Sequence, residues 1–570
     1  MAARLQSVQH VSVTPEGQRR CKLLLVRVPE FEFDLCQDDV RHVSSASLDV
    51  PLGVTTLAAV LRDAGKHDVK ILDLFAINID AIREYMMDRN PACMAVITDH
   101  LVSAIREWQP DIVGFSALYL FQHSIVRHLS RKAKEEAPGA AVFLGGYCTL
   151  APEILLPDLP DVDVVFMGEA ELTLPMALDC YNRESELEKV PSIGFRRADG
   201  SYHYNAERLQ VADFTDVPRP AYELLPLHIY DRVYGERVLS MMTSRSCPNA
   251  CSFCASSLYG ARGLRTRRLD RLVADLRHMR DELGMTRLII RDDFFNGNKK
   301  HCKQFLRAII EHGFVTSWCD SSSFHVNSLD EEFLDLCKAS GCDPAIFAIE
   351  SASQRVLREV MNKRVDLDHA RRMVSYCHKI GLPIEAYFVI GNPTETADEI
   401  LQTIELAEEL GCDNAVFSIA TPLPGTKYYS DALSAGLMKN DIATLANLKF
   451  VNVNLCSDEF SPQWLKDTQY EANMRVNFYG YRYLKGGASD LQIAVRRFEG
   501  VHSQYPFHVV AALLAGYAHQ RLANMEAAAR MYQRVETLLQ DPGLAEVYGR
   551  FIAWPNPAND AYREWKRAAG

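Results

Sequence analysis

Three cysteines lie close together near the middle of the chain, at Cys247, Cys251 and Cys254. They follow the apolar run 238–242, so we expect them on one loop at the end of a buried strand. Three thiolates on such a loop can bind three irons of a 4Fe–4S cluster. Because no fourth cysteine lies nearby, the remaining iron would stay open to a ligand from outside the chain.

Two other interpretations of the three cysteines stay open at this point. Together with one distant ligand, they could hold a structural zinc ion. They could also be ordinary buried thiols, since cysteine is among the residue types found most often inside proteins. The choice depends on the elements that position the loop.

The composition of the chain is that of a globular protein. Its 570 residues are 48% hydrophobic and 24% charged, and this length suggests about three or four domains. The net charge of −12 argues against a nucleic-acid partner. No apolar run is long enough to span a bilayer, and the first 20 residues lack an apolar signal core. We therefore expect a cytoplasmic chain without a membrane partner, whose other cysteines are free thiols.

The N-terminal part of the chain alternates apolar segments with helical patterns. Such alternation predicts an α/β fold with a doubly wound parallel sheet, which binds ligands at the carboxyl ends of its strands. Three of the strands end in the small residues Ser116-Ala117, Gly145-Gly146 and Gly168-Glu169, which allow either a close ligand or simply a tight turn. The expected strands are residues 22–28, 68–74, 111–116, 140–144 and 163–167.

A second series of strands and helices begins just before the cysteines. Six strands that alternate with helices predict a partial (β/α)6 barrel with its chemistry at the carboxyl ends of the strands. Polar motifs follow these strands: Asp292-Asp293-Phe-Phe, Asp320-Ser-Ser-Ser, Glu350-Ser-Ala-Ser, Gly391-Asn-Pro-Thr-Glu395 and Thr421-Pro-Leu-Pro-Gly-Thr426. The expected strands are residues 238–242, 287–291, 315–319, 344–349, 384–390 and 414–419.

The cysteine spacing, with Phe253 before the last cysteine, and the polar motifs resemble the radical S-adenosylmethionine (SAM) enzymes. The resemblance implies that the open iron binds SAM and that the reduced cluster cleaves it to methionine and a 5′-deoxyadenosyl radical. It also implies that Phe253 packs against the adenine and that Asp292 and Asp293 lie near the amino group of SAM. Ser321 and Glu350 would then lie near its ribose or methionine portion.

The N-terminal part resembles the cobalamin-binding domain that precedes the radical module in one class of these enzymes. The matching pieces are Pro51-Leu-Gly-Val-Thr-Thr-Leu-Ala-Ala-Val-Leu-Arg, Pro110-Asp-Ile-Val-Gly-Phe-Ser, Leu144-Gly-Gly-Tyr and Gly168-Glu-Ala-Glu171. The cobalamin contacts that this resemblance implies are Ser116, Tyr119, Leu120, Gly145, Gly146, Gly168 and Glu169.

The motif D-x-H-x-x-G, whose histidine binds cobalt from below in some cobalamin domains, does not occur in the chain. The resemblance therefore implies a cobalt without a histidine beneath it, and we expect Tyr119, Leu120 and Phe121 to cover that face. The alternative is that His123 binds the cobalt, although a lone histidine at a helix start more often has a capping or packing role.

The two resemblances together imply a cobalamin-dependent radical SAM methyltransferase that acts on an unactivated carbon of a small molecule or natural product. The alternatives are a ring closure or rearrangement without net methyl transfer, and a cobalamin-binding sensor without catalysis. The cofactors carry the chemistry, so we expect no side chain to act as a catalytic acid or base.

The implied reducing partner is a flavodoxin or a ferredoxin. Four arginines follow the cysteine loop, where one could pair with the SAM carboxylate and the others could form a basic dock for an acidic electron donor. The simpler interpretation of each is a solvated residue near a helix start. They are Arg262, Arg265, Arg267 and Arg268.

The expected domain organisation has five parts. A leader of residues 1–20 precedes the cobalamin-binding domain at 21–200. A linker rich in Pro, Tyr and Asp follows at 201–237, and the radical SAM barrel occupies 238–435. Residues 436–570 should form a helical domain, in which one segment weakly resembles a single helix-turn-helix repeat.

Overall fold

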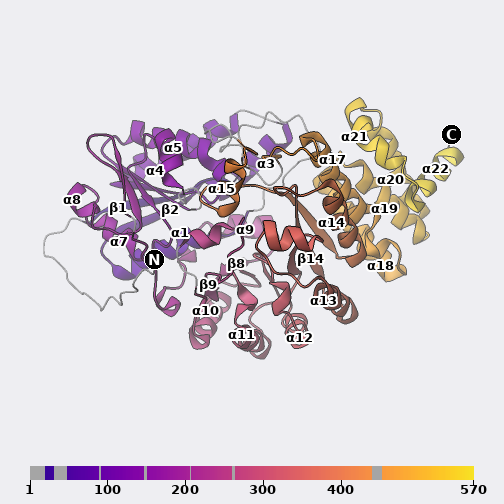
Figure 1. Cartoon of the computed structure of the whole chain (residues 1–570), viewed down its shortest axis with the longest axis horizontal. Helices are drawn as coiled ribbons and strands as arrows, with labels where there is room; N and C mark the ends of the chain where they lie inside the picture. The colour runs from indigo at the N-terminus through magenta and orange to yellow at the C-terminus, as the bar shows by residue number, and fades with distance from the viewer. Residues whose placement is uncertain are drawn as a thin grey trace. The chain divides into compact units, whose positions relative to one another are not determined.

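The computed structural model describes residues 20–30, 48–88, 92–146, 151–205, 207–259, 263–438, 448 and 452–569 (Figure 1). The expected leader lies outside these residues except for Arg20. The chain divides into two compact units. The first contains Met1–Asp343, Val360–Lys363 and Thr421–Leu455; the second contains Pro344–Glu359, Arg364–Ala420 and Cys456–Gly570.

The first unit contains a seven-stranded sheet in the order β2-β1-β3-β4-β5-β6-β7. The five strands from β1 to β5 are parallel, and their bounds agree with the expected strands within one or two residues. Their order has its switch point between β1 and β3, which is where doubly wound sheets bind ligands. The strands are β1 (Lys22–Arg27), β2 (Asp68–Asp73), β3 (Ile112–Ser116), β4 (Ala141–Gly145), β5 (Val164–Phe166), β6 (Ile193–Arg196) and β7 (Tyr202–Tyr204).

The strands β6 and β7 extend this sheet by an antiparallel hairpin that was not expected. Strand β7 thus belongs to the sheet, although the sequence analysis placed residues 202–204 in the linker. The strand has only three residues, Tyr-His-Tyr, and all three are half-buried, so it carries no apolar run that would reveal it.

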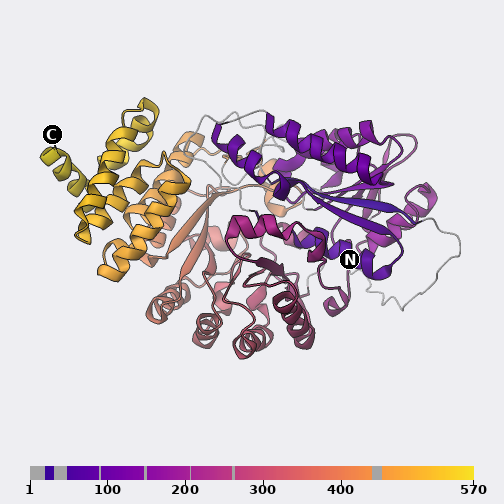
Figure 2. The same cartoon turned by 180° about the vertical axis from the view of Figure 1, so that it is seen from behind.

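Helices cover both faces of the seven-stranded sheet, as its parallel core requires. Helices α4 (Ala92–Trp108) and α5 (His123–Glu136) lie side by side on one face (Figures 1 and 2). Helix α1 (Leu52–Ala64) ends at Gly65, whose φ of 64° forms a left-handed cap that returns the chain to β2. The all-apolar centre of β1 is buried completely between the two helix layers.

The first unit also holds three of the six strands expected for the partial barrel. Strands β8 (Val238–Met241), β11 (Arg287–Ile290) and β12 (Ser317–Asp320) form a parallel sheet in the order β12-β11-β8. Helices α10 (Leu269–Asp281), α11 (Lys299–His312) and α12 (Glu331–Ala339) lie side by side along it (Figures 1 and 2). A two-stranded antiparallel ribbon, β9 (Ser244–Arg245) and β10 (Arg265–Thr266), closes the base of the cysteine loop.

The second unit contains the other three expected strands as a parallel sheet, β13 (Ala345–Glu350), β14 (Ile384–Ile390) and β15 (Asn414–Ile419). Helix α17 (Pro462–Asn473) and a π-helical segment, Met474–Tyr479, continue from it. The Asn477 side chain satisfies the backbone of edge strand β15, because it accepts from Ala415 N at 2.7 Å and donates to Ala415 O at 2.6 Å. These contacts cover an edge that would otherwise be free to pair with another strand.

The C-terminal region is helical, as expected. Helix α19 is buried along most of its length between its neighbours, and the Cβ of any other residue at Gly516 would lie 2.7 Å from the Tyr532 ring. No described helix has the length and apolar content needed to cross a membrane. The helices are α18 (Ala488–Gln504), α19 (Val509–Arg521), α20 (Met525–Leu538), α21 (Pro542–Ile552) and α22 (Pro557–Ala569).

Candidate functional site

A cavity of about 540 Å³ lies at the carboxyl ends of the parallel strands in the first unit. One wall comes from β1, β3, β4 and β5 of the seven-stranded sheet, and the other from residues 242–322 around the cysteine loop. Eight residues predicted to contact cofactors line it together. They are Ser116, Tyr119, Gly145, Gly146, Gly168, Glu169, Asp293 and Ser321.

The two glycines after β4 have different roles in this cavity. A Cβ on Gly145 would meet no atom within 4 Å, so this position leaves open space in the cavity wall. Gly146 has a φ of 110°, and a Cβ there would lie 2.0 Å from the backbone oxygen of Ala117. Gly146 is therefore required by the turn itself, whereas Gly145 keeps room for a ligand.

The loop after β3 is held in place by a buried glutamine. Gln122 accepts a hydrogen bond from Tyr119 N at 2.8 Å and donates to the carbonyls of Val28 and Pro29 at 3.0 and 3.1 Å. The loop is thereby fixed to the end of β1, and Tyr119 lies in the cavity wall, stacked on Phe121 at a ring distance of 4.9 Å. Leu120, which was also predicted to contact cobalamin, is buried and does not line the cavity.

The three cysteines of the motif lie half-buried on one loop and form no disulfide. Asn249 donates to the Cys247 sulfur at 3.3 Å. Ser252, between the other two cysteines, donates from its backbone to Met361 O at 2.9 Å and from its hydroxyl to Val360 O at 2.5 Å. The loop is therefore anchored to the 360–363 segment.

The chemistry of the donor set fits an iron–sulfur cluster. Three thiols on one anchored loop are the ligands that a 4Fe–4S cluster with an open iron needs.

The acids of the Asp292-Asp293 motif hold the cysteine loop and the strand that leads into it. Asp292 is fully buried and accepts hydrogen bonds from Thr243 N at 2.6 Å, Thr243 Oγ1 at 2.5 Å and Ser244 Oγ at 2.7 Å. Burial raises the pKa of Asp292 to about 6, although these hydrogen bonds act in the opposite direction. Its carboxylate thus accepts hydrogen bonds inside the protein, and its predicted contact with SAM stays a prediction.

Asp293 connects the two ends of the cysteine loop. Its carboxylate accepts from Ser246 N at 2.9 Å, just before the first cysteine, and from Ser256 Oγ at 3.2 Å, just after the last. Asp293 also lines the cavity, so it remains a candidate for a contact with SAM. Phe253 is half-buried outside the cavity lining, and its predicted contact with adenine stays a prediction.

Sequence reasoning missed a group of charged residues at the cavity. Arg291 forms an ion pair with Asp49 at 2.7 Å and donates to Ser321 Oγ at 2.9 Å. Arg27 is buried at the end of β1 and forms an ion pair with Glu30 at 2.8 Å. The position of Arg291, directly before Asp292-Asp293, was the available signal, whereas nothing local in the sequence pairs Asp49 with it.

The arginines after the cysteine loop are engaged within the protein. Arg265 binds Glu169, and Arg267 is buried in an ion pair with Asp275 at 3.0 Å. Arg268 is exposed and pairs with Asp270 at 2.8 Å. Arg262 lies outside the described residues. Arg265 and Arg267 therefore do not form the basic dock that the sequence analysis considered.

In the second unit, the predicted SAM contact Glu350 ends β13 at a register shift, with a φ of 70°. A residue other than glycine is strained in this region. The serines that follow bind helix α14 (Ala397–Leu410): Ser351 Oγ lies 3.3 Å from Thr403 Oγ1, and Ser353 Oγ donates to Glu399 at 2.7 Å. The motif thus turns the chain sharply, and the contact of Glu350 with SAM stays a prediction.

Known families match both halves of this arrangement. A B12 binding domain is matched over residues 43–178 and the Radical SAM superfamily over residues 241–407. An uncharacterized methyltransferase of Pyrococcus horikoshii is 31% identical over 389 residues, which cover 68% of this chain and 79% of that protein. The cytidylyl-2-hydroxyethylphosphonate methyltransferase of Streptomyces wedmorensis is 29% identical over 459 residues, which cover 74% of this chain and 84% of that protein.

A solved structure has the same fold over most of the chain. The cobalamin-dependent SAM radical enzyme OxsB, solved with aqua-cobalamin and SAM bound, matches with a TM-score of 0.60 at 14% identity. The match covers 92% of this chain and 84% of OxsB. The fold and the site define a B12-binding radical SAM enzyme. The chain belongs to the cobalamin-dependent radical SAM methyltransferases, whose cofactors are a 4Fe–4S cluster, SAM and cobalamin.

Proposed function

We propose that this enzyme transfers a methyl group to an unactivated carbon of a small-molecule substrate, and that the transfer takes place in the cavity of the first unit. The observation that supports this is the composition of the cavity wall. The glycine-rich ends of the cobalamin sheet and residues on both sides of the cysteine loop, Ser246 and Ser256, line the same space. A substrate in this space would lie between the two cofactor regions.

When bound, the cluster and SAM supply a 5′-deoxyadenosyl radical, and cobalamin supplies the methyl group. The residues of the chain orient these groups and exclude water. Cys247, Cys251 and Cys254 would ligate the cluster. Gly145 would leave room for the corrin, and Tyr119 would cover one of its faces.

The charged residues of the cavity would orient the polar part of the substrate. Arg291 and Arg27 already have carboxylate partners, Asp49 and Glu30, so they form a fixed polar wall and not a free cationic site. A substrate with hydroxyl or amide groups would suit such a wall better than a multiply charged anion.

We assign no catalytic acid or base to the chain. A flavodoxin or ferredoxin would supply electrons to the cluster, and such a partner places the enzyme in the cytoplasm. An oxygen-sensitive cluster is consistent with a reducing compartment.

Methyl transfer can be tested before the substrate is known. The anaerobically reconstituted enzyme is reduced with cobalamin and SAM that carries a deuterated methyl group. We expect the label to appear in methylcobalamin, with one equivalent of S-adenosylhomocysteine. Formation of 5′-deoxyadenosine alone, without label in cobalamin, would contradict methyl transfer and favour ring closure or rearrangement.

A further inference from the structure

The ribbon β9–β10 closes the base of the loop that carries the three cysteines. Arg245 pairs with Arg265 across the ribbon, and Ser244 pairs with Thr266. The loop leaves the ribbon at Ser246 and returns to it before Arg265. Because both ends of the loop start from this ribbon, the position of the ribbon sets the position of the cysteines.

Both arginines of the ribbon bind acids at the end of strand β5 in the cobalamin-binding sheet. Arg265 binds Glu169 through two hydrogen bonds, one of them between Nη1 and Oε2 at 3.2 Å. Arg245 Nη2 lies 2.7 Å from Glu171 Oε1, and its Nη1 lies 3.5 Å from Glu169 Oε2. The four side chains, which we name the acid–arginine network, are 8–15% exposed.

The charges of this network compensate one another inside the protein. Burial by itself would raise the pKa of Glu169, but the hydrogen bond from Arg265 and the charges of Arg245 and Arg265 outweigh it and lower the pKa. Burial likewise opposes the charge of Arg245, yet Glu171 and Glu169 raise its pKa. Removal of one partner would leave a buried charge without compensation, which would lower the free energy of unfolding.

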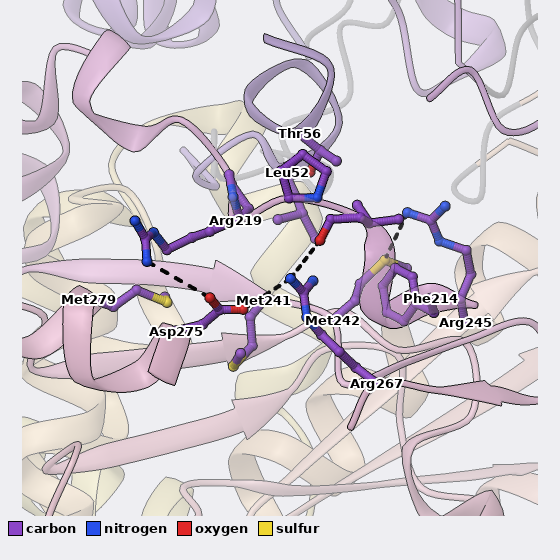
Figure 3. A pocket seen from close by; sticks show the side chains of 13 residues that line it. Leu52, Thr56, Phe214, Arg219, Met241, Met242, Arg245, Arg267, Asp275 and Met279 are labelled. Carbon is purple, nitrogen blue, oxygen red and sulfur yellow. Dashed lines mark hydrogen bonds and ion pairs between the residues drawn. The ribbon is translucent and has the colours of Figure 1, made fainter. Parts of the chain in front are cut away.

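The segment of residues 211–217 also contacts the network. Val211 N donates to Glu169 Oε2 at 3.0 Å, and its carbonyl accepts from Arg265 at 2.5 Å. The ring of Phe214 lies 4.7 Å from the guanidinium of Arg245, and the Met242 sulfur lies 4.0 Å from the same guanidinium (Figure 3). The 211–217 segment therefore holds the ribbon together with the two acids.

The acid–arginine network also forms part of the cavity wall. Glu169, Glu171, Arg245 and Ser246 line the cavity, whereas Arg265 lies behind them. A ligand that presses on the end of β5 would therefore act on residues that hold the cysteine loop. Glu169 lines the cavity, so its predicted contact with the cofactor stays a prediction, and its partners within the chain are the two arginines.

We propose that Glu169 and Glu171 are positioning residues that couple cobalamin in the cavity to the geometry of the cysteine loop, through Arg265 and Arg245. The proposal rests on the proposed function, in which cobalamin fills this cavity and SAM binds the cluster. Coupling of this kind is reciprocal, so cobalamin strengthens SAM binding by the same factor by which SAM strengthens cobalamin binding.

The test measures this coupling on the cluster-loaded enzyme under anaerobic conditions. The dissociation constant of hydroxocobalamin is determined with and without saturating SAM, and that of SAM with and without cobalamin. For each ligand, the ratio is its dissociation constant without the other ligand divided by that with it. We expect the two ratios to agree and to be about five or more in the unchanged enzyme. In Arg265→Gln the ratios should fall to about one, while the iron content and the cobalamin affinity measured without SAM stay within about twofold.

A double-mutant cycle separates a positioning role from a general structural one. Arg265→Gln, Glu169→Gln and the double variant should all lose the coupling, because each removes the ion pair between Arg265 and Glu169. Glu135→Gln breaks the exposed pair with Lys132 on the surface of the same sheet domain and should keep the full coupling. If Arg265→Gln does not retain its cluster, Arg245→Lys replaces it, since it keeps the charge but loses the geometry of the guanidinium.

Two results would overturn the proposal: ratios near one in the unchanged enzyme, or full coupling in Arg265→Gln. Neither measurement requires methyl transfer. An enzyme that shows the coupling but does not label methylcobalamin would contradict the proposed function alone.

Discussion

The Nε2 atom of His123 lies 2.9 Å from a carboxylate oxygen of Asp158. Arg127 donates to the same carboxylate at 3.0 Å, and His123 is only 4% exposed at the start of α5. The imidazole thus has a charged partner on the helix side of the loop. His123, the alternative cobalt ligand of the sequence analysis, therefore has a structural role in this arrangement.

We therefore predict that cobalt has no histidine ligand in this enzyme. Electron paramagnetic resonance of the cob(II)alamin form should show no nitrogen superhyperfine splitting from an axial ligand. His123→Ala should leave that spectrum unchanged and lower the free energy of unfolding by about 1–3 kcal/mol, because Asp158 loses a buried partner. A splitting that disappears in His123→Ala would show the opposite assignment.

The two glycines after β4 should respond differently to substitution. Gly145→Leu places a side chain in open cavity space, so cobalamin affinity should fall by about tenfold or more with little change in stability. Gly146→Ala places a Cβ against Ala117 O in a left-handed conformation, so the free energy of unfolding should fall by about 2 kcal/mol or more. Cobalamin titration and urea unfolding of both variants measure the contrast, and tight cobalamin binding by Gly145→Leu would contradict the placement of the corrin.

Substitutions of two neighbouring residues on the loop after β3 should also have different effects. Tyr119 is 39% exposed in the cavity wall, so Tyr119→Ala should weaken cobalamin binding by several-fold and leave the fold intact. Leu120 is buried away from the cavity, so Leu120→Ala should lower the free energy of unfolding by about 2 kcal/mol or more. Cobalamin titration and urea unfolding measure both variants. If Leu120→Ala changed only the cobalamin affinity, Leu120 would be the residue that contacts cobalamin.

The cysteine loop should hold one cluster per chain. Anaerobic reconstitution should give about four irons per chain, and replacement of Cys247, Cys251 and Cys254 by Ala should abolish both the iron and SAM cleavage. Cys456→Ala, which removes an exposed cysteine outside the loop, is the control and should keep the full iron content. A triple variant that still carries a cluster would show that the ligands lie elsewhere.

Stability should depend on pH through Asp292. Its pKa is about 6 in the folded protein and 3.8 ordinarily, so the folded state binds more protons between these values. The free energy of unfolding should therefore fall as the pH rises through this window, by about 3 kcal/mol in total. Asp292→Asn should lose this contribution.

Urea unfolding of both proteins from pH 5 to pH 8 measures the effect of Asp292. From pH 5 to pH 8 the unchanged protein should lose stability relative to the variant, because burial of the ionised Asp292 is unfavourable and the amide does not titrate. A difference that stays constant over this range would show that the carboxyl does not titrate there.

The strands that could be predicted from the sequence were those with a continuous apolar run. The predicted bounds of β14 and β15 are the observed ones, Ile384–Ile390 and Asn414–Ile419. The strands that were not predicted are short: β6 has four residues, β7 has three, and β9 and β10 have two each. Such strands are stabilised by their partners, so their own residues carry too little pattern to indicate them.

The residue types of the site follow from the sequence, whereas their partners follow from the tertiary structure. The spacing of the cysteines and the glycine-rich strand ends are local, because a loop or a turn needs its residues in consecutive order. The pairing of Glu169 with Arg265 joins residues 96 positions apart, and that of Arg291 with Asp49 joins the residue after β11 to the segment before α1. Long-range pairs depend on how elements pack, so only the folded chain decided that Asp292 holds the loop and that Glu169 holds the ribbon.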